Sequence, residues 1–268
     1  MRTRLYLSPA FAEAWNGKDV FAEAFALEGE VFRHVKSRRT FRFELGGRGY
    51  FAKIHHGVGW REIFKNLLQF KLPVLGADNE YLALRRLAAI GVDSMTPAAY
   101  AARGANPARL ESFLITEELT DTVSLEDYCR DWAARPPAFT EKNALLSKVA
   151  RMTSLMHRAG INHRDCYICH FLLKRDSIGS GEYKLHIIDL HRAQLRLKVP
   201  YRYRVKDVAG LFFSAMELGL TRRDLLRFIR EYGDAPLKIV LDRDRNFWRA
   251  VDCTARNLFR KIHHREFL

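Results

Sequence analysis

The stretch of sequence that decides the fold is Gly160-Ile-Asn-His163-Arg164-Asp165-Cys166-Tyr-Ile-Cys169-His170. A carboxylate just past a helix end, on a loop held by a strand, is a common way to fix a catalytic base. Asp165 is therefore the candidate base, and the alternative is that it only caps local backbone. The helix before it is predicted by apolar residues that recur on one face and end at Gly160, namely Leu145, Val149, Met152 and Met156.

Two short strands are expected after this stretch, at residues 171–173 and 183–188, on either side of a turn-forming segment. The second strand ends at Asp189, so the hairpin returns a second carboxylate toward Asp165. Phosphoryl transfer needs two such groups, because one accepts the hydroxyl proton and the other holds the magnesium ion that neutralises the phosphates. The alternative for Asp189 is an ion pair with nearby Arg192.

The rest of the chain separates into a β-rich part and a helical part. Residues 30–55 alternate and are rich in β-branched and aromatic side chains, which predicts three antiparallel strands. The boundary between the parts is predicted near residues 117–119, and helices dominate after it. The other expected elements are strands near 98–102 and 110–116, helices at 60–68 and 79–89, and turns at 36–39 and 46–49.

Composition and charge narrow the class of protein. The chain has 268 residues, 48% of them apolar, which excludes a disordered tail or a disulfide-stapled miniprotein. Its net charge of +14 predicts an anionic partner: nucleic acid, nucleotide, anionic lipid or phosphorylated sugar. Four cysteines are too few for a disulfide scaffold and indicate a reducing compartment such as the cytoplasm. The sequence predicts neither export nor a membrane span, which needs about 18 apolar residues in a row.

The order of the candidate residues resembles the protein kinase pattern. His163-Arg164-Asp165 matches the H-R-D loop, and Asp189-Leu190-His191 lies where D-F-G would lie. Earlier in the chain, Lys53 resembles the third-strand lysine that contacts the nucleotide phosphates, and Glu80 resembles its ion-pair partner. The occurrence of these motifs in the order of the kinase pattern is far more specific evidence for a kinase than any one motif alone.

More narrowly, the chain resembles the inner-core lipopolysaccharide kinases of Gram-negative bacteria. The resemblance implies an α+β, two-lobed protein kinase-like fold. It implies a small β-rich N-lobe at 1–118, with a five-stranded sheet plus helices, and a larger α-helical C-lobe at 119–268. It also implies phosphorylation of a heptose hydroxyl (heptose I) of the growing core, with ATP and Mg²⁺, by a cytoplasmic enzyme peripheral to the inner membrane. The stretches that carry it are 73–78, 115–119, 124–129, 160–172 and 188–195.

The resemblance implies a role for each of four charged residues. Asp165 would deprotonate the acceptor hydroxyl and Asp189 would hold Mg²⁺, while Lys53, set by Glu80, would align the phosphates of ATP. The residues alone leave two alternatives open. Lys53 alternates with apolar neighbours and could be a surface lysine, and Asp78 competes with Glu80 as its partner.

Four further residues are expected to support this chemistry. Glu117 and Leu119 fall at the hinge of the kinase pattern, where backbone groups would receive adenine. His163 and Asp207 would be structural, with Asp207 as a buried anchor for the catalytic loop. The alternative for Asp207 is an ordinary cap at the start of a helix.

The sequence departs from the general kinase pattern at several positions. The turn Lys36-Ser37-Arg38-Arg39 stands where a glycine-rich loop is usual, so cationic side chains are expected to contact the phosphates. His170 replaces the metal-binding Asn and is a second candidate metal ligand, although imidazole suits Mg²⁺ poorly. Tyr167 replaces the Lys of Ser/Thr protein kinases, which disfavours a protein substrate. Cys166-x-x-Cys169-His170 also matches haem and zinc patterns, but buried thiols are the favoured interpretation.

Basic residues concentrate directly after Asp189, where kinases bind the acceptor. We expect an anionic sugar or lipid phosphate to bind there, and the alternative is a solvated face. The basic amphipathic helix at 60–68 is expected to pack on the core rather than to contact a membrane. The arginines expected to bind the acceptor are Arg192, Arg196, Arg202 and Arg204.

Two rival functions stay open at this point. A protein kinase, perhaps acting on tyrosine, would transfer phosphate from ATP to protein instead of glycolipid. A non-catalytic basic module would bind nucleic acid or anionic membrane and would not be stabilised by Mg-ATP. The favoured partners are the lipopolysaccharide core glycolipid and the anionic inner-membrane surface. Nucleic acid is not expected, and the sequence identifies no protein partner.

Overall fold

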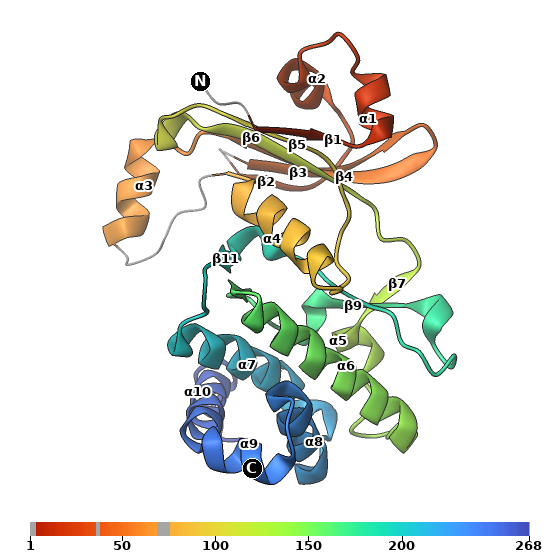
Figure 1. The fold of residues 1–268 in the computed structure, drawn as a ribbon, viewed down its shortest axis with the longest axis vertical. Coiled ribbons are helices and arrows are strands. Elements are labelled where there is room, and N and C mark those ends of the chain that lie inside the picture. The colour runs from red at the N-terminus through yellow and green to blue at the C-terminus, as the bar shows by residue number, and fades with distance from the viewer. Residues whose placement is uncertain (1–3, 36–37, 69–75, 268) are drawn as a thin grey trace. The chain divides into compact units, whose positions relative to one another are not determined.

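The computed structural model describes residues 4–35, 38–68 and 76–267 (Figure 1). The chain divides into two compact units, of which the first contains residues up to Arg85 together with Met95–Leu119. The second contains Arg86–Ser94 and Thr120–Leu268. The expected N-lobe of residues 1–118 therefore includes one stretch, Arg86–Ser94, that belongs to the helical unit. No helix among the described residues is both long and apolar enough to cross a membrane.

The first unit is built on an antiparallel sheet of six strands in the order β1-β5-β6-β4-β3-β2. The prediction of five strands is corrected by β1, which pairs with β5 in the register Arg4 to Ala102. The strand was missed because four residues at a sheet edge are too few to show a period. The strands are β1 (Arg4–Leu7), β2 (Glu30–Val35), β3 (Arg38–Leu45), β4 (Arg48–His56), β5 (Pro97–Arg103) and β6 (Glu111–Glu117).

Alternation along β4 gives the sheet two different faces. Tyr50, Ala52 and Ile54 are buried in an aromatic-rich core beneath α1 (Pro9–Ala14) and α2 (Val20–Ala26). The intervening residues face the other way because successive side chains of a strand point to opposite faces. Figure 1 shows α1 and α2 on one face of the sheet and the start of α4 (Asp78–Ala89) on the other. Lys53 is thereby presented to α4.

The turns of this unit fit the sequence in part. Gly46 and Gly47 adopt positive φ angles of 57° and 73° between β3 and β4, a conformation that glycine takes without strain. Arg38 and Arg39, expected in the preceding turn, belong to β3. Lys36 and Ser37 lie outside the described residues, as do residues 73–75 of the stretch 73–78. Helix α3 (Gly59–Leu68) and the short η1 (Pro107–Arg109) complete the unit.

The second unit is mainly helical, as expected. Helix α6 covers the predicted long helix, and Gly160 follows it with φ of +79°. The hydrophobic core of this second unit joins α6, α7 and α10 through side chains such as Val205, Val251 and Phe259. The helices are α5 (Leu125–Tyr128), α6 (Phe139–Arg158), α7 (Tyr201–Ala215), α8 (Arg222–Gly233), α9 (Leu237–Arg243) and α10 (Arg245–His263), with short turns η2 (Ile168–His170), η3 (Arg175–Ser177), η4 (Leu190–Arg192) and η5 (Met216–Leu218).

Two small antiparallel sheets hold the central loops of this unit. The predicted hairpin forms from β9 (Phe171–Lys174) and β10 (Leu185–Ile187), and β7 (Thr122–Ser124), which was not predicted, adds to its edge. The strands β8 (Ile161–Asn162) and β11 (Gln194–Leu195) pair with each other. This second pairing brings Gly160 close to residue 196, because the Arg196 amide donates to the Gly160 carbonyl at 2.8 Å.

Candidate active site

In the first unit, Lys53 and Glu80 form a short ion pair. Lys53 Nζ lies 2.6 Å from Glu80 Oε1, with the lysine side chain 17% exposed and the glutamate 2% exposed. Asp78, the competing carboxylate, is instead bonded to Arg4 at 2.8 Å and to the Tyr100 hydroxyl at 2.7 Å. The geometry therefore selects Glu80 as the partner of Lys53. Glu80 Oε2 has no hydrogen-bond partner in the described part of the chain, so this carboxylate depends on the lysine.

The predicted hinge residues lie at the end of β6. Glu117 is paired with Tyr50 of β4, and its amide donates to the Thr96 carbonyl at 2.9 Å. A contact of Glu117 with adenine would thus have to use its carbonyl group. Glu118 accepts two hydrogen bonds from Arg42 Nε, at 2.9 and 3.0 Å, and holds the end of the sheet together. Leu119 is the last residue of this unit.

In the second unit, Asp207 of α7 anchors the catalytic loop. Its carboxylate accepts hydrogen bonds from the amides of His163, at 2.6 Å, and Arg164, at 2.8 Å. His157 of α6 bonds to the same carboxylate at 3.2 Å and to the Tyr232 hydroxyl at 2.8 Å. Asp207 is buried, and groups from both the catalytic loop and α6 hold its carboxylate. Arg164, next to the candidate base, takes a φ of +77° that this anchor helps to maintain.

His163 ties the loop to the end of the hairpin. Its ring is buried, which lowers its pKa and keeps it neutral. Nε2 lies 2.9 Å from the Ile188 carbonyl, which can only accept, so Nε2 carries the proton and donates it. The expected structural role of His163 thus has a specific form: it connects the loop before Asp165 to the residue before Asp189.

Asp165 is paired with Arg192. Arg192 Nη1 donates to both carboxylate oxygens of Asp165, at 2.6 and 2.9 Å. The side chains of Asp165 and Arg192 are 20% and 39% exposed, so the pair is partly open to solvent. The structure thus pairs Arg192 with Asp165, and it gives no support to the alternative of an ion pair between Arg192 and Asp189.

Asp189 follows β10 in the left-handed conformation, with φ of +60°. His191 Nδ1 bonds to Asp189 Oδ1 at 2.6 Å, and His170 Nε2 lies 3.7 Å from Asp189 Oδ2. The hairpin does bring this carboxylate back beside the catalytic loop, since Ile187 pairs with Phe171 and the Ile188 amide donates to the His170 carbonyl.

His170 is tied to the catalytic loop through one of its two ring nitrogens. Its Nδ1 donates to the Asp165 carbonyl at 2.7 Å and its ring stacks on His163. A hydrogen bond with Cys169 and the bond to the Asp165 carbonyl raise the pKa of His170 to about 9, against the effect of burial. Its other ring nitrogen, Nε2, faces the Asp189 carboxylate.

The haem and zinc interpretation of the Cys166 segment finds no support in the geometry. Burial raises the pKa of the Cys166 thiol well above its usual value, which disfavours the thiolate that a metal needs. Among the described residues, no group of three or more His, Cys, Asp and Glu side chains could hold a metal ion. Cys166 packs as a buried thiol, as favoured from the sequence.

The four arginines expected to bind an acceptor have different partners. Arg196 bonds to Asn162 and Gln194, so it braces the β8–β11 pair. Arg196 and Arg202 both pack on the Tyr203 ring, with guanidinium carbons 4.6 Å from its centroid. Arg204 lies over Phe247, and its Nε is buried without a hydrogen-bond partner in the described residues. Only Arg192 contacts a carboxylate of the catalytic loop.

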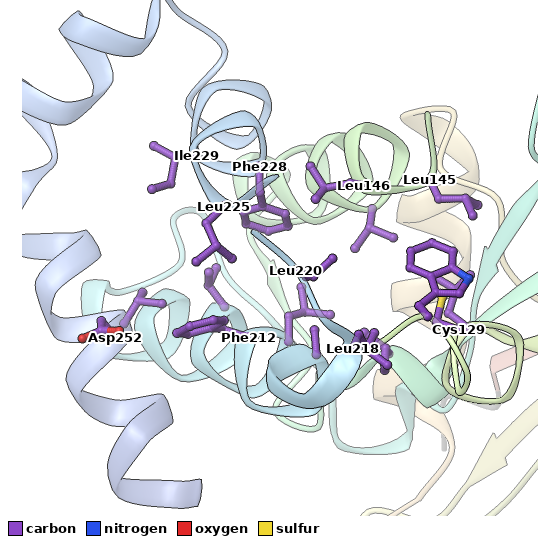
Figure 2. Close-up of a pocket in the computed structure, with 18 of the residues that line it drawn as sticks. Cys129, Leu145, Leu146, Phe212, Leu218, Leu220, Leu225, Phe228, Ile229 and Asp252 are labelled. Atoms are coloured by element: carbon purple, nitrogen blue, oxygen red, sulfur yellow. The ribbon is translucent and has the colours of Figure 1, made fainter. Parts of the chain in front are cut away.

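An apolar cavity of about 220 Å³ lies within the helical unit (Figure 2). Figure 2 shows side chains from several helices converging on it, Leu146 from α6, Phe212 from α7 and Phe228 from α8 among them. Asp252 stands at one side of the cavity as its charged lining residue. The sequence did not predict this cavity, because its walls come from segments more than a hundred residues apart.

Three residues of the site were missed by sequence reasoning. His191 bonds to Asp189, and His157 and Tyr232 extend the Asp207 network. The contact of His191 could have been predicted from the sequence, because His191 lies two residues after Asp189, the candidate metal ligand. For His157 and Tyr232 there was no such signal, because Tyr232 lies 75 residues from His157 and neither has a distinctive neighbour.

Comparisons with known proteins agree on one family. The model of the lipopolysaccharide kinase (Kdo/WaaP) family matches residues 22–232. A lipopolysaccharide core heptose(I) kinase WaaP of Pseudomonas aeruginosa is 55% identical over 239 residues, 89% of this chain and 89% of the relative. One of Escherichia coli, with the same description, is 53% identical over 241 residues, 90% of this chain and 91% of the relative.

A solved structure is similar over nearly the whole length. It is described as WaaP in complex with acyl carrier protein, with a TM-score of 0.84 and 47% sequence identity, and the match covers 96% of this chain and 99% of that chain. The expected protein kinase-like fold, with a β-sheet lobe and a helical lobe, is thereby confirmed.

Proposed function

This chain belongs to the lipopolysaccharide kinase (Kdo/WaaP) family, and on that premise we propose how its residues transfer a phosphoryl group from ATP to heptose I of the lipopolysaccharide core. The chain is a kinase that acts on a sugar hydroxyl of that core. The single observation that carries the assignment of residues is the loop of Asp165, which two hydrogen bonds from its backbone amides to buried Asp207 hold in place.

Asp165 is the base in this proposal. Its carboxylate accepts the proton of the heptose hydroxyl as the oxygen attacks phosphorus, so a hydroxyl proton moves to Asp165 Oδ. Both oxygens of Asp165 are bonded to Arg192, and the arginine has to yield at least one of them first. An anionic group of the acceptor can replace Asp165 as the partner of Arg192. Arg192 is therefore the arginine that binds the acceptor in this proposal.

Magnesium fits the carboxylate of Asp189. Mg²⁺ usually binds one or two carboxylates together with phosphate oxygens and water. Asp189 supplies such a carboxylate, oriented by His191, and the described residues form no larger cage. Asp189 would hold the ion, which neutralises phosphate charge when bound. We do not include His170, because imidazole suits Mg²⁺ poorly compared with oxygen ligands.

Lys53 aligns the phosphates of ATP, and Glu80 positions the lysine. The strand that carries Lys53 and the helix that carries Glu80 are both packed elements, so the pair is held without a flexible loop. Glu117, through its carbonyl, and Leu119 are proposed to receive adenine. The reaction takes place at the cytoplasmic face of the inner membrane, where the chain is a peripheral protein.

The test is Asp165→Asn in a transfer assay with ATP, Mg²⁺ and heptose-bearing acceptor. Loss of the base lowers kcat by about a thousandfold, within the usual range for general base catalysis. The control is Asp131→Asn, an exposed carboxylate of the same unit that forms an ion pair with Arg135. ATP binding, followed by the shift in melting temperature, stays intact in both variants. Full activity of Asp165→Asn would refute the assignment.

The rival functions give different results in the same assay. A protein kinase would place the label from ATP on protein, and the wild-type chain would leave the core glycolipid without added phosphate. A basic binding module would show no melting shift with Mg-ATP. A mass increase of one phosphate on the inner core excludes both.

The apolar cavity favours a second proposal, that this chain binds acyl carrier protein. The similar solved structure is described as a complex with that protein. An acyl carrier protein presents a fatty acyl chain, and the cavity in Figure 2 offers an almost wholly apolar lining to such a chain. Leu146→Trp would fill the cavity and reduce copurification of the carrier. Leu155→Trp, at an exposed position of the same helix, is the control.

A further inference from the structure

Helix α3 carries an apolar face that the rest of its unit leaves exposed. Trp60, Phe64 and Leu68 recur every four residues, so their side chains share one side of the helix. They are 51%, 58% and 82% exposed. The Trp60 and Phe64 rings lie 5.9 Å apart, which makes them one continuous surface. Scattered exposed apolar residues are ordinary, but three in one row on a ten-residue helix are not.

The helix is anchored through a different side chain. Ile63 is 6% exposed and is the only buried side chain among those described for α3. The helix contacts the short η1, and Figure 1 shows it at the end of the sheet, beyond the strands. The sequence predicted that α3 packs on the core. The structure shows that Ile63 does so, while the row of Trp60, Phe64 and Leu68 does not.

Two cations border the exposed row. Arg61 and Lys65 each follow a member of the row by one residue, which turns them about 100° around the helix from Trp60 and Phe64. Both are exposed. Long basic side chains at this position can place their charges at the level of lipid headgroups while the apolar row enters the acyl region. Tryptophan is the residue that favours this interface most, together with tyrosine.

We propose that α3 docks this protein on an anionic lipid bilayer by inserting Trp60, Phe64 and Leu68. This inference rests on the proposed function, because the acceptor is a glycolipid that is presented at a membrane. Charge complementarity selects the bilayer as the occupant of this face. A second copy of the chain would bring +14 against +14, whereas an anionic leaflet attracts Arg61, Lys65 and the net charge alike.

The first test is binding to vesicles. We compare vesicles of phosphatidylethanolamine and phosphatidylglycerol with vesicles of phosphatidylcholine, using flotation. The wild type binds the anionic vesicles, and Trp60→Ser with Phe64→Ser lowers binding at least tenfold. Arg61→Gln with Lys65→Gln lowers it by about fivefold for each charge removed, and salt has less effect on that variant. The matched control is Phe139→Ser with Leu155→Ser, two exposed apolar residues of α6, which leaves binding unchanged.

The second test locates the contact. Trp60 is the most exposed of the four tryptophans, since Trp15 is buried and Trp132 and Trp248 are half-buried. Its fluorescence shifts to the blue with anionic vesicles and is quenched by lipids brominated along their acyl chains. Trp60→Phe keeps an aromatic ring and still binds, but it loses the shift. Wild-type vesicle binding without quenching would overturn the insertion, because the chain would then bind by surface charge alone.

Activity separates this inference from the proposed function. The Trp60→Ser, Phe64→Ser variant keeps wild-type transfer to acceptor dispersed in detergent and loses it, by at least tenfold, with acceptor embedded in vesicles. Equal vesicle binding by this variant and the wild type would overturn the docking role of α3. Loss of acyl carrier protein binding in the variant, with vesicle binding retained, would also overturn it and would identify a protein surface. If the wild type fails to phosphorylate dispersed acceptor, the proposed function fails, whatever the vesicles show.

Discussion

Asp207 and Asp165 belong to the same unit and serve the same loop, yet their surroundings differ in kind. Asp207 is fully buried, and its oxygens are occupied by two amides and an imidazole from fixed backbone and helix positions. Asp165 is partly exposed and bonded to one long arginine side chain. The first carboxylate has partners that cannot leave without unfolding, and the second has a partner that can. The difference separates a group that builds the loop from a group that can react.

The pair of Lys53 and Glu80 lies between these two cases. Glu80 is as buried as Asp207, but its single strong partner is a flexible lysine whose charge can also serve a phosphate. A buried carboxylate with several fixed partners therefore has a structural role, and a buried carboxylate with one exchangeable partner has a functional role. Four substitutions test this distinction.

The largest effect is expected for Asp207→Ala. Removing the carboxylate leaves two buried amides and a buried imidazole without their acceptor, so the free energy of unfolding falls by about 4 kcal/mol. Activity falls with it, because the Asp165 loop loses its anchor. Thermal unfolding measures the first effect and phosphate transfer the second. Asp234→Ala is the control, since this residue is exposed and pairs with Arg158 at the surface. If Asp207→Ala kept a normal melting temperature but lost activity, Asp207 would have a role in the reaction and not in the stability of the loop.

Lys53→Met is expected to lower kcat/KM for ATP about a hundredfold, or about 2.7 kcal/mol of transition-state stabilisation. It also lowers the melting temperature, because Glu80 is left buried and unpaired. Adding Glu80→Leu removes that charge, so the double variant recovers its melting temperature but not its activity. Recovery of both would mean that the pair is only structural. Lys18→Met, an exposed lysine of the same unit, is the control for both measurements.

Asp224→Asn tests a fully partnered carboxylate far from the proposed chemistry. Burial alone would raise the pKa of Asp224, but hydrogen bonds from Lys142 and Thr221 outweigh it, and the pKa lies below its ordinary value of 3.8. Its stabilisation is thus complete above that value and is lost as the pH falls through the lower, folded-state pKa. We expect the variant to lose about 2 kcal/mol at pH 7 with unchanged kcat.

The sign of this effect can be checked by unfolding wild type and Asp224→Asn over a range of pH. The two curves converge in acid, once Asp224 is protonated in both states. A difference that persists undiminished at the acid end would show that the charge of Asp224 contributes nothing. The matched control is Asp252→Asn, whose carboxylate pairs with Arg256 at the surface.

Arg192→Gln is expected to have the smallest effect and to act on substrate binding. The arginine is exposed enough that its loss leaves the melting temperature unchanged. The KM for a phosphate-bearing acceptor rises about tenfold, which corresponds to about 1.4 kcal/mol. Arg202→Gln, whose guanidinium bonds only to Tyr203 among the contacts of the described residues, changes KM less. Equal effects of the two variants would assign the acceptor contact to the general basic surface.

Much of the fold could be predicted because its signals are local. Alternation of apolar residues predicted β2, β3 and β4, and helical spacing predicted α6. Asp165 was found because it follows the end of a helix, and Asp189 because it ends the second strand of the hairpin. Four strands were not predicted: β1, β7, β8 and β11. Each has at most four residues and is defined by distant partners, such as Ala102 for β1 and Leu173 for β7. No local pattern records such pairings.

Side-chain partners were harder to predict than side-chain roles. The order of motifs placed Asp165 and Arg192 in one site, but not in one ion pair, because charge attraction between them depends on how η4 turns the chain. Arg196 was expected on a binding surface and instead braces β8 against β11. The exposed row on α3 escaped notice because a sequence shows that a helix is amphipathic, and not how much of its apolar side is covered.

Gly160 sets a limit on how this protein can vary. A β-carbon there would lie 1.9 Å from the Arg196 carbonyl oxygen, and the backbone at +79° already disfavours every other residue. The single residue at position 160 thus affects the end of α6, the β8–β11 pair and the start of the catalytic loop together. Among functional variants drawn from a random library of this chain, position 160 should tolerate no replacement, whereas the neighbouring Ala159 should accept several.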